Sequence, residues 1–190
     1  MQQETSLPSL LTTQIDGLKA AVLQKYGQEG ADLLERYNPY HIFRKQLTAN
    51  ECFFGEYPTL GQLRAKFDSR FPGAWLMAHL YDLSEYCGCK GKLEGHALQQ
   101  CASVISMEFH YLKLSELMLF FHRFKTGRYG RFYGSVDPLI ITESLRKFCE
   151  ERWQAYERHE QAQREQRETD SRKNAITYEQ YQQMKKEGKI

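Results

Sequence analysis

The residues best suited to chemistry lie in one basic, aromatic and glycine-rich stretch, Arg123–Gly134. Four cations and four aromatic rings alternate there with glycines, and no acidic residue interrupts them. The candidate binding residues are the four cations and three of the rings: Arg123, Lys125, Arg128, Arg131, Tyr129, Phe132 and Tyr133. Cations of this kind bind phosphates, rings stack on bases, and glycines let the backbone approach a nucleic-acid strand closely. The stretch therefore predicts a nucleic-acid-binding loop, with DNA or RNA as the partner.

A purely structural interpretation of the same stretch carries about equal weight. Arg123 and Lys125 are cations of the kind favoured at a helix C-terminus, and Gly127 suits a helix C-cap. The rings would then pack the loop onto the core. The segment Gly127-Arg128-Tyr129-Gly130 also matches the GxxG signature of KH domains, but no flanking segment alternates like a strand, so that fold is not favoured.

Cysteine and histidine offer a weaker pattern, because Cys87, Cys89, His96 and Cys101 could together form a zinc site. The C-x-C spacing differs from the usual C-x₂₋₄-C, however, and Cys101 also fits the apolar face of a helix. His79 lies among leucines, where a hydrogen-bonded core histidine is expected. We therefore expect no metal ion, and no other cofactor.

Motifs of catalysis are absent from the sequence. It contains no nucleophile elbow, no paired-carboxylate motif, no dinucleotide fingerprint and no P-loop. We therefore expect no catalytic residues and a non-enzymatic protein, with an enzyme of unknown type as the least favoured alternative.

Composition limits the classes of partner and compartment. The formal net charge of +2 is too small for the whole-protein field to attract nucleic acid, so a local patch would have to do so. Five cysteines without a signal-like apolar stretch predict free thiols and a cytoplasmic location. No apolar run reaches the ~18 residues that a membrane-spanning helix needs, so we expect no membrane partner.

The elements that must position the loop are all predicted to be helices. Apolar residues at helical spacing predict helices over residues 10–23, 31–37, 60–67, 75–86, 97–112, 115–124 and 138–156. The first should stop at Gly27, and residues 40–57 show no sustained period. The expected fold is all-α: a compact multi-helix bundle with the loop between its two last core helices and a helical C-terminal extension.

Cap residues and polarity refine these elements. Thr59 and Ser115 are expected N-caps, and Asp137-Pro138 should open the last core helix. The domain organisation that follows is N-terminal helices with an irregular linker over 1–57, a helical core over 58–156, and a charged extension with a short helix over 157–190.

The C-terminal segment supplies a second hypothesis for function. Tyr178, Tyr181 and Met184 lie at a spacing of three, after the capping-box pair Thr177 and Gln180. Such a stripe suits docking of a short helix into a groove of a partner. The chain could then be an adaptor that binds a protein through its C-terminal helix.

The order of Leu114-Ser115-Glu116, Phe120-Phe121, Phe124-Lys125, GRYGRFYG and Asp137-Pro138 resembles an uncharacterised family of small proteins from phages and mobile elements of gut bacteria. The resemblance covers about residues 58–160, and its GRYGRFYG core is its most specific part. It implies no activity and no site residues. It favours a non-enzymatic accessory role in nucleic-acid metabolism of a phage or mobile element.

Overall fold

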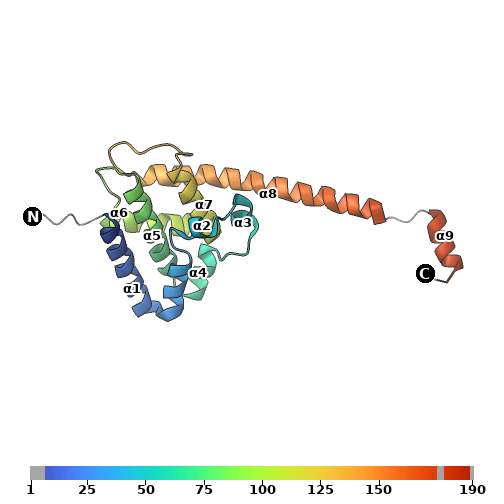
Figure 1. The fold of residues 1–190 in the computed structure, drawn as a ribbon, viewed down its shortest axis with the longest axis horizontal. Coiled ribbons are helices and arrows are strands. Elements are labelled where there is room, and N and C mark those ends of the chain that lie inside the picture. Colours follow the sequence, from blue (N-terminus) through green and yellow to red (C-terminus); the bar gives the residue numbers. More distant parts are fainter. Residues whose placement is uncertain (1–6, 175–177, 189–190) are drawn as a thin grey trace, which may run out of the picture. The chain divides into compact units, whose positions relative to one another are not determined.

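The computed structural model describes residues 7–174 and 178–188, and side chains over residues 16–173 and 182–188. The described residues form nine helices and no strand, which confirms the predicted all-α class (Figure 1). Two compact units divide the chain, residues 1–149 and residues 150–190. In chain order the helices are α1 Leu7–Arg36, α2 His41–Lys45, α3 Ala49–Phe54, α4 Leu60–Lys66, α5 Phe71–Tyr86, α6 Gly95–Glu108, α7 Leu114–Lys125, α8 Pro138–Asn174 and α9 Tyr178–Lys186.

The predicted break at Gly27 is confirmed as a kink in α1. Gly27 has non-helical backbone angles, with φ 70° and ψ −169°, and it separates two helical stretches that run from Leu7 to Arg36. Just after this helix, the carbonyl of Tyr37 accepts hydrogen bonds from Trp75 Nε1 at 2.9 Å and His79 Nε2 at 3.0 Å. These two donors on α5 fix the end of α1 to the core, and His79 is the hydrogen-bonded core histidine that its sequence position predicts.

The segment before α4 is more regular than its sequence indicates. Residues 40–57 contain the two short helices α2 and α3, and α3 begins with a capping box between Thr48 and Glu51. The expectation of an irregular linker was wrong here, because helices of five and six residues are too short to show a period. The prediction for Thr59 is confirmed, since its hydroxyl accepts the backbone N–H of Gln62 at 3.1 Å.

Helix α7 is the central buried helix of the first unit. It contacts α2, α3 and α5, and Figure 1 shows it among them. Its apolar side chains are almost completely buried on every face, as are Ser115 and Glu116. Ser115 is not the N-cap that we expected: Lys113 is, and the Ser115 hydroxyl donates to the Cys52 carbonyl at 2.7 Å. The Ser115 hydroxyl thus binds a backbone carbonyl on α3 and does not cap α7.

The predicted start of the last core helix is confirmed. The Asp137 carboxylate accepts the backbone N–H of Leu139 at 2.8 Å, and the helix begins at Pro138. Within the first unit Ile141, Leu145 and Phe148 are fully buried. Beyond it, Trp153 is 61% exposed, although it is one of the apolar residues whose spacing predicts the helix over residues 138–156.

Two more large apolar side chains of the predicted helices over residues 75–86 and 97–112 are also exposed. Tyr86 at the end of α5 is 63% exposed, and Val104 on α6 is 47% exposed. Apolar spacing alone therefore does not establish that each apolar residue of a helix faces the core. Across residues 7–174 and 178–188, no helix combines the length and the apolar character needed to cross a membrane.

Candidate nucleic-acid interface

The loop begins where α7 ends, in a Schellman motif. Gly127 has φ 81°, and its N–H donates to the carbonyl of Phe124 at 2.9 Å. The N–H of Arg128 reaches back to the carbonyl of Arg123 at 3.1 Å. These two bonds satisfy carbonyls at the end of the helix and need a left-handed residue at position 127. Gly127 is therefore the helix stop that the sequence predicts.

The two cations on α7 itself are turned toward the protein. The Arg123 guanidinium lies 5.7 Å from the ring centre of Phe53 and 5.9 Å from that of Phe148. Lys125 forms an ion pair with Asp82 on α5, in which the lysine side chain is 10% exposed and the aspartate 8%. The Lys125 ammonium also lies 5.4 Å from the ring centre of Tyr86. Both cations thus contact the core.

Two of the three loop rings also face the core. Tyr129 packs beside Phe120 with ring centres 5.6 Å apart, and Phe132 stacks on Phe124 at 5.1 Å. Because Phe120 and Phe124 are buried residues of α7, these contacts fasten both halves of the loop to that helix. The packing interpretation of the sequence therefore describes Arg123, Lys125, Tyr129 and Phe132.

The remaining three candidates form the loop tip, defined here as Arg128, Arg131 and Tyr133. All three are exposed, and the Tyr133 side chain is 86% accessible to solvent. Arg131 has no ion-pair partner within the described part of the chain. A ring and two guanidinium groups are thereby presented outward on a loop whose inner residues are fixed.

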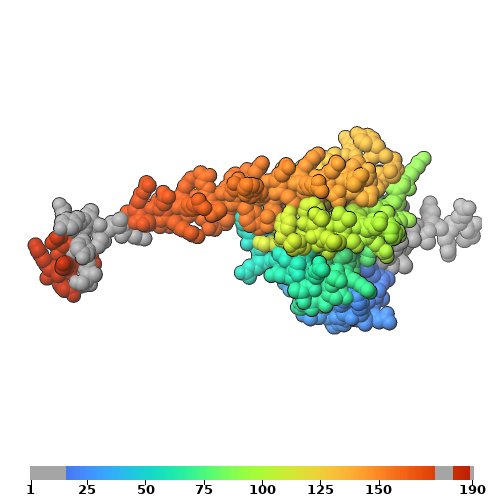
Figure 2. Space-filling view, turned by 180° about the vertical axis from the view of Figure 1, so that it is seen from behind, coloured from blue at the N-terminus to red at the C-terminus, as the bar shows by residue number. Residues whose placement is uncertain are grey.

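A second turn, which we did not single out from the sequence, lies against the end of the loop. The N–H of Gly91 donates to the Gly134 carbonyl at 3.1 Å, and the N–H of Val136 donates to the Gly91 carbonyl at 2.8 Å. Figure 2 shows the gold loop beside the green segment before α6. Lys90 precedes Gly91 and is exposed, so it adds a cation next to the loop. The sequence signal was the short run Lys90-Gly91-Lys92.

The other sequence candidates are dispersed. The described residues bring no three His, Cys, Asp or Glu side chains together in a way that could hold a metal ion. Cys101 is buried on α6, where burial raises the pKa of its thiol to about 11. In α9, Met184 is partly exposed, whereas the side chains of Tyr178 and Tyr181 and the expected Thr177 cap lie outside the described residues.

Comparison with known proteins identifies a family but no activity. The model of DUF6633, a family of unknown function, matches residues 92–189, which is more than half of the 190-residue chain. The match includes the whole loop and begins directly after Gly91. No curated protein and no solved structure matches the chain. The chain belongs to the DUF6633 family.

Proposed function

We propose that the protein is a non-enzymatic accessory protein that binds nucleic acid through the loop tip. The observation that carries the proposal is the division of the loop, in which four residues contact the core while Arg128, Arg131 and Tyr133 face solvent. A loop needed only for packing would not require two exposed guanidinium groups beside an exposed ring. Lys90 on the neighbouring turn extends the basic surface.

The chemistry of the loop tip suits a single strand. Guanidinium groups bind phosphate oxygens through paired hydrogen bonds, and a tyrosine ring can stack on an unpaired base. One stacked base contributes roughly 1–3 kcal/mol, and each neutralised phosphate adds a salt-dependent contribution. We therefore propose that Tyr133 favours single-stranded over duplex nucleic acid. The resemblance to phage and mobile-element proteins supports a role in handling the nucleic acid of such an element.

Fluorescence anisotropy tests this proposal with labelled single-stranded and duplex DNA and RNA over a series of salt concentrations. Replacing Arg128 and Arg131 together by Ala should weaken binding and reduce the salt slope by about two phosphate contacts. The matched control replaces Arg146 and Lys147, two exposed cations on α8, by Ala. Tyr133→Ala should weaken single-strand binding more than duplex binding.

Two results would contradict the proposal. One is the absence of binding by the unmodified protein at low salt. The other is an equal loss in the loop-tip variant and in the Arg146 and Lys147 control, which would mean that only overall charge matters.

A second candidate function is an adaptor that captures a protein through α9. It is favoured by the extension that precedes α9, because every side chain from residue 157 to residue 173 is exposed. Such a solvated helix has no core to cover and suits a spacer that carries a binding helix. Truncation after Asp170 should then abolish capture of the partner while nucleic-acid binding remains unchanged.

A further inference from the structure

A cleft of about 600 Å³ lies between α1, α5 and α6, with the end of α4 at its rim. Figure 2 shows these segments on one face, with α6 in lime, the α4–α5 region in teal and green, and α1 in blue. Three cations line the cleft, Lys25, Arg64 and Arg70, and its lining includes no carboxylate. This volume is in the range of sites for small organic ligands.

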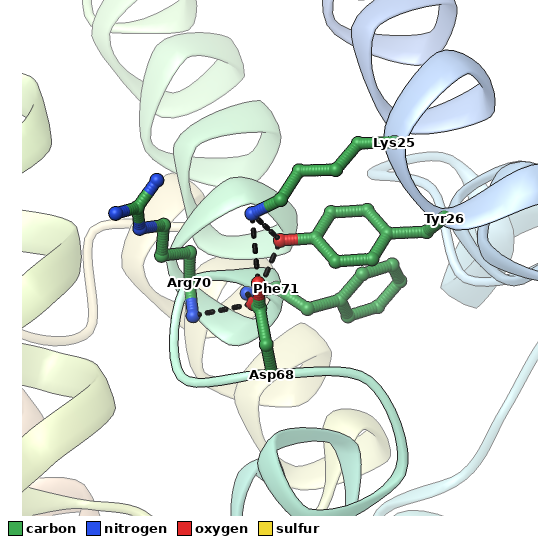
Figure 3. Close-up of polar contacts among 5 residues, drawn as sticks. All are labelled: Lys25, Tyr26, Asp68, Arg70 and Phe71. Carbon is green, nitrogen blue, oxygen red and sulfur yellow. Dashed lines mark hydrogen bonds and ion pairs between the residues drawn. The ribbon is translucent and has the colours of Figure 1, made fainter.

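Asp68, the carboxylate that pairs with the cleft residue Lys25, already accepts hydrogen bonds from several donors. It accepts Lys25 Nζ and the Tyr26 hydroxyl, each at 2.7 Å, and the backbone N–H groups of Arg70 at 2.8 Å and Phe71 at 3.0 Å. The Lys25 ammonium and the Tyr26 hydroxyl hold the pKa of this carboxyl well below its usual range. Figure 3 shows that the Arg70 side chain extends away from Asp68, although its backbone N–H donates to it. Asp68 thus neutralises Lys25 but not Arg70.

Two guanidinium groups therefore remain uncompensated at this cleft. Arg64 and Arg70 are both exposed, and neither has an ion-pair partner among the residues that the structure describes. Ser69 and Gln99 add neutral polar groups to the lining. Two guanidinium forks with neutral donors beside them match a dianionic phosphate, which offers several acceptor oxygens.

Much of the remaining lining is apolar, although Ser103 and Ser106 also belong to it. Met77 and Met107 form part of its wall, together with Ala74 near the start of α5. Methionine is flexible and polarisable, so it adapts to apolar groups of different shapes. A ligand that fills this space needs an apolar body in addition to its anionic group.

We propose that the cleft binds a small soluble phosphomonoester joined to an apolar body, with the phosphate on Arg64 and Arg70 and the body against Met77 and Met107. This site is separate from the loop tip and involves none of its residues.

Isothermal titration calorimetry of the full chain tests the site with AMP, phenyl phosphate, inorganic phosphate and adenosine as probes. We expect AMP and phenyl phosphate to bind more tightly than inorganic phosphate, and adenosine not to bind. Replacing Arg64 and Arg70 together by Gln should weaken AMP binding by about a hundredfold or more, since two charge-assisted contacts are lost. Arg146→Gln, a change of an exposed arginine on α8, should leave AMP binding unchanged.

A steric variant tests the apolar part without altering charge. A Cβ at Gly73, a cleft residue, meets no atom within 4 Å, so Gly73→Leu should fold and fill the cleft. Gly17→Leu is the matched control on α1, where an added Cβ also has open space. We expect AMP binding to be lost in the first variant and retained in the second.

Three results would overturn the proposal. The first is that neither AMP nor phenyl phosphate binds the folded protein. The second is that inorganic phosphate binds as tightly as both. The third is that AMP binds equally well to the unmodified protein, to the variant lacking Arg64 and Arg70, and to Gly73→Leu, with circular dichroism showing that all three are folded.

Discussion

The Cα atom of Gly91 lies so close to Ser135 that a Cβ added at residue 91 would be 2.6 Å from the Ser135 Cβ and 3.2 Å from its Cα. The backbones of these two residues form a parallel bridge between the turn before α6 and the end of the loop. Only glycine at position 91 permits this approach. The relationship sets the position of the loop end relative to Lys90.

We predict that Gly91→Ala separates the two turns. The overlap forces a backbone shift, for which overpacking costs of about 1–3 kcal/mol are typical. Urea unfolding should show this loss in the free energy of unfolding. The affinity for single-stranded nucleic acid should fall as well, because Lys90 moves away from the loop.

The Ser135→Gly change in the same variant supplies the control, since it removes the nearer of the two clashing atoms. The double variant should regain part of the lost stability. If Gly91→Ala alone is as stable as the unmodified protein, the two turns do not pack as the structure describes.

The sequence predicts the helices that carry strong local signals. The stop at Gly27, the caps at Thr59 and Asp137, and the Schellman glycine at position 127 depend on neighbours within a few residues, and all four are confirmed. Local hydrogen bonds of this kind are encoded by residue type and spacing. They can therefore be predicted from the amino-acid sequence alone.

What could not be predicted depends on partners far away in the sequence. Ser115 has the residue type of an N-cap, yet its hydroxyl donates to Cys52, 63 positions earlier. Lys125 resembles a free phosphate-binding cation until its pairing with Asp82 on α5 is known. The pairing of Gly91 with the loop likewise joins residues more than forty positions apart. No pattern within a window of the sequence contains such information.

The Lys125 and Asp82 pair should matter for stability and not for nucleic-acid binding. Asp82→Asn leaves a nearly buried ammonium without its counter-ion, and Lys125→Met leaves a nearly buried carboxylate. Loss of one partner from a buried pair costs about 3–5 kcal/mol, and loss of both costs less than the sum. Chemical unfolding of the two single variants and the double variant measures this coupling. Additive losses would show that the pair does not interact. A reduced salt dependence of nucleic-acid binding in Lys125→Met would show that Lys125 contacts the nucleic acid.

The stability of the fold should decrease as the pH falls below the ordinary pKa of histidine. Burial lowers the pKa of His79 to about 3, from an ordinary value of 6.5, so the imidazole stays neutral in the folded protein. Below pH 6.5 the unfolded chain takes up a proton that the folded chain does not, and this favours unfolding. Above pH 6.5 both states are neutral and the contribution vanishes.

Urea unfolding at pH 7 and pH 5 measures this effect. One such histidine should lower the free energy of unfolding by about 1.4 kcal/mol per pH unit in that window. Burial also lowers the pKa of His41, so His79→Gln should show a smaller pH dependence but not a flat one. Equal pH dependence in the variant and the unmodified protein would show that His79 is not the group responsible.

The exposed part of α8 should be a helix stabilised only by its own side chains. Glu160 and Arg164 pair at 2.5 Å, His159 and Gln163 lie 2.9 Å apart, and further pairs at the same spacing follow. Each such pair contributes roughly 0.2–0.5 kcal/mol, far less than a packed apolar face. Amides of residues 157–173 should therefore exchange with deuterium orders of magnitude faster than those of α7, because they open without unfolding the core.

Mass spectrometry of the exchanged peptides tests this at two protein concentrations. Slow exchange at both would mean that contacts beyond these local pairs stabilise the helix. Slow exchange at the higher concentration alone would mean that a second copy of the chain covers it, so the helix would be an interface between chains and not a spacer.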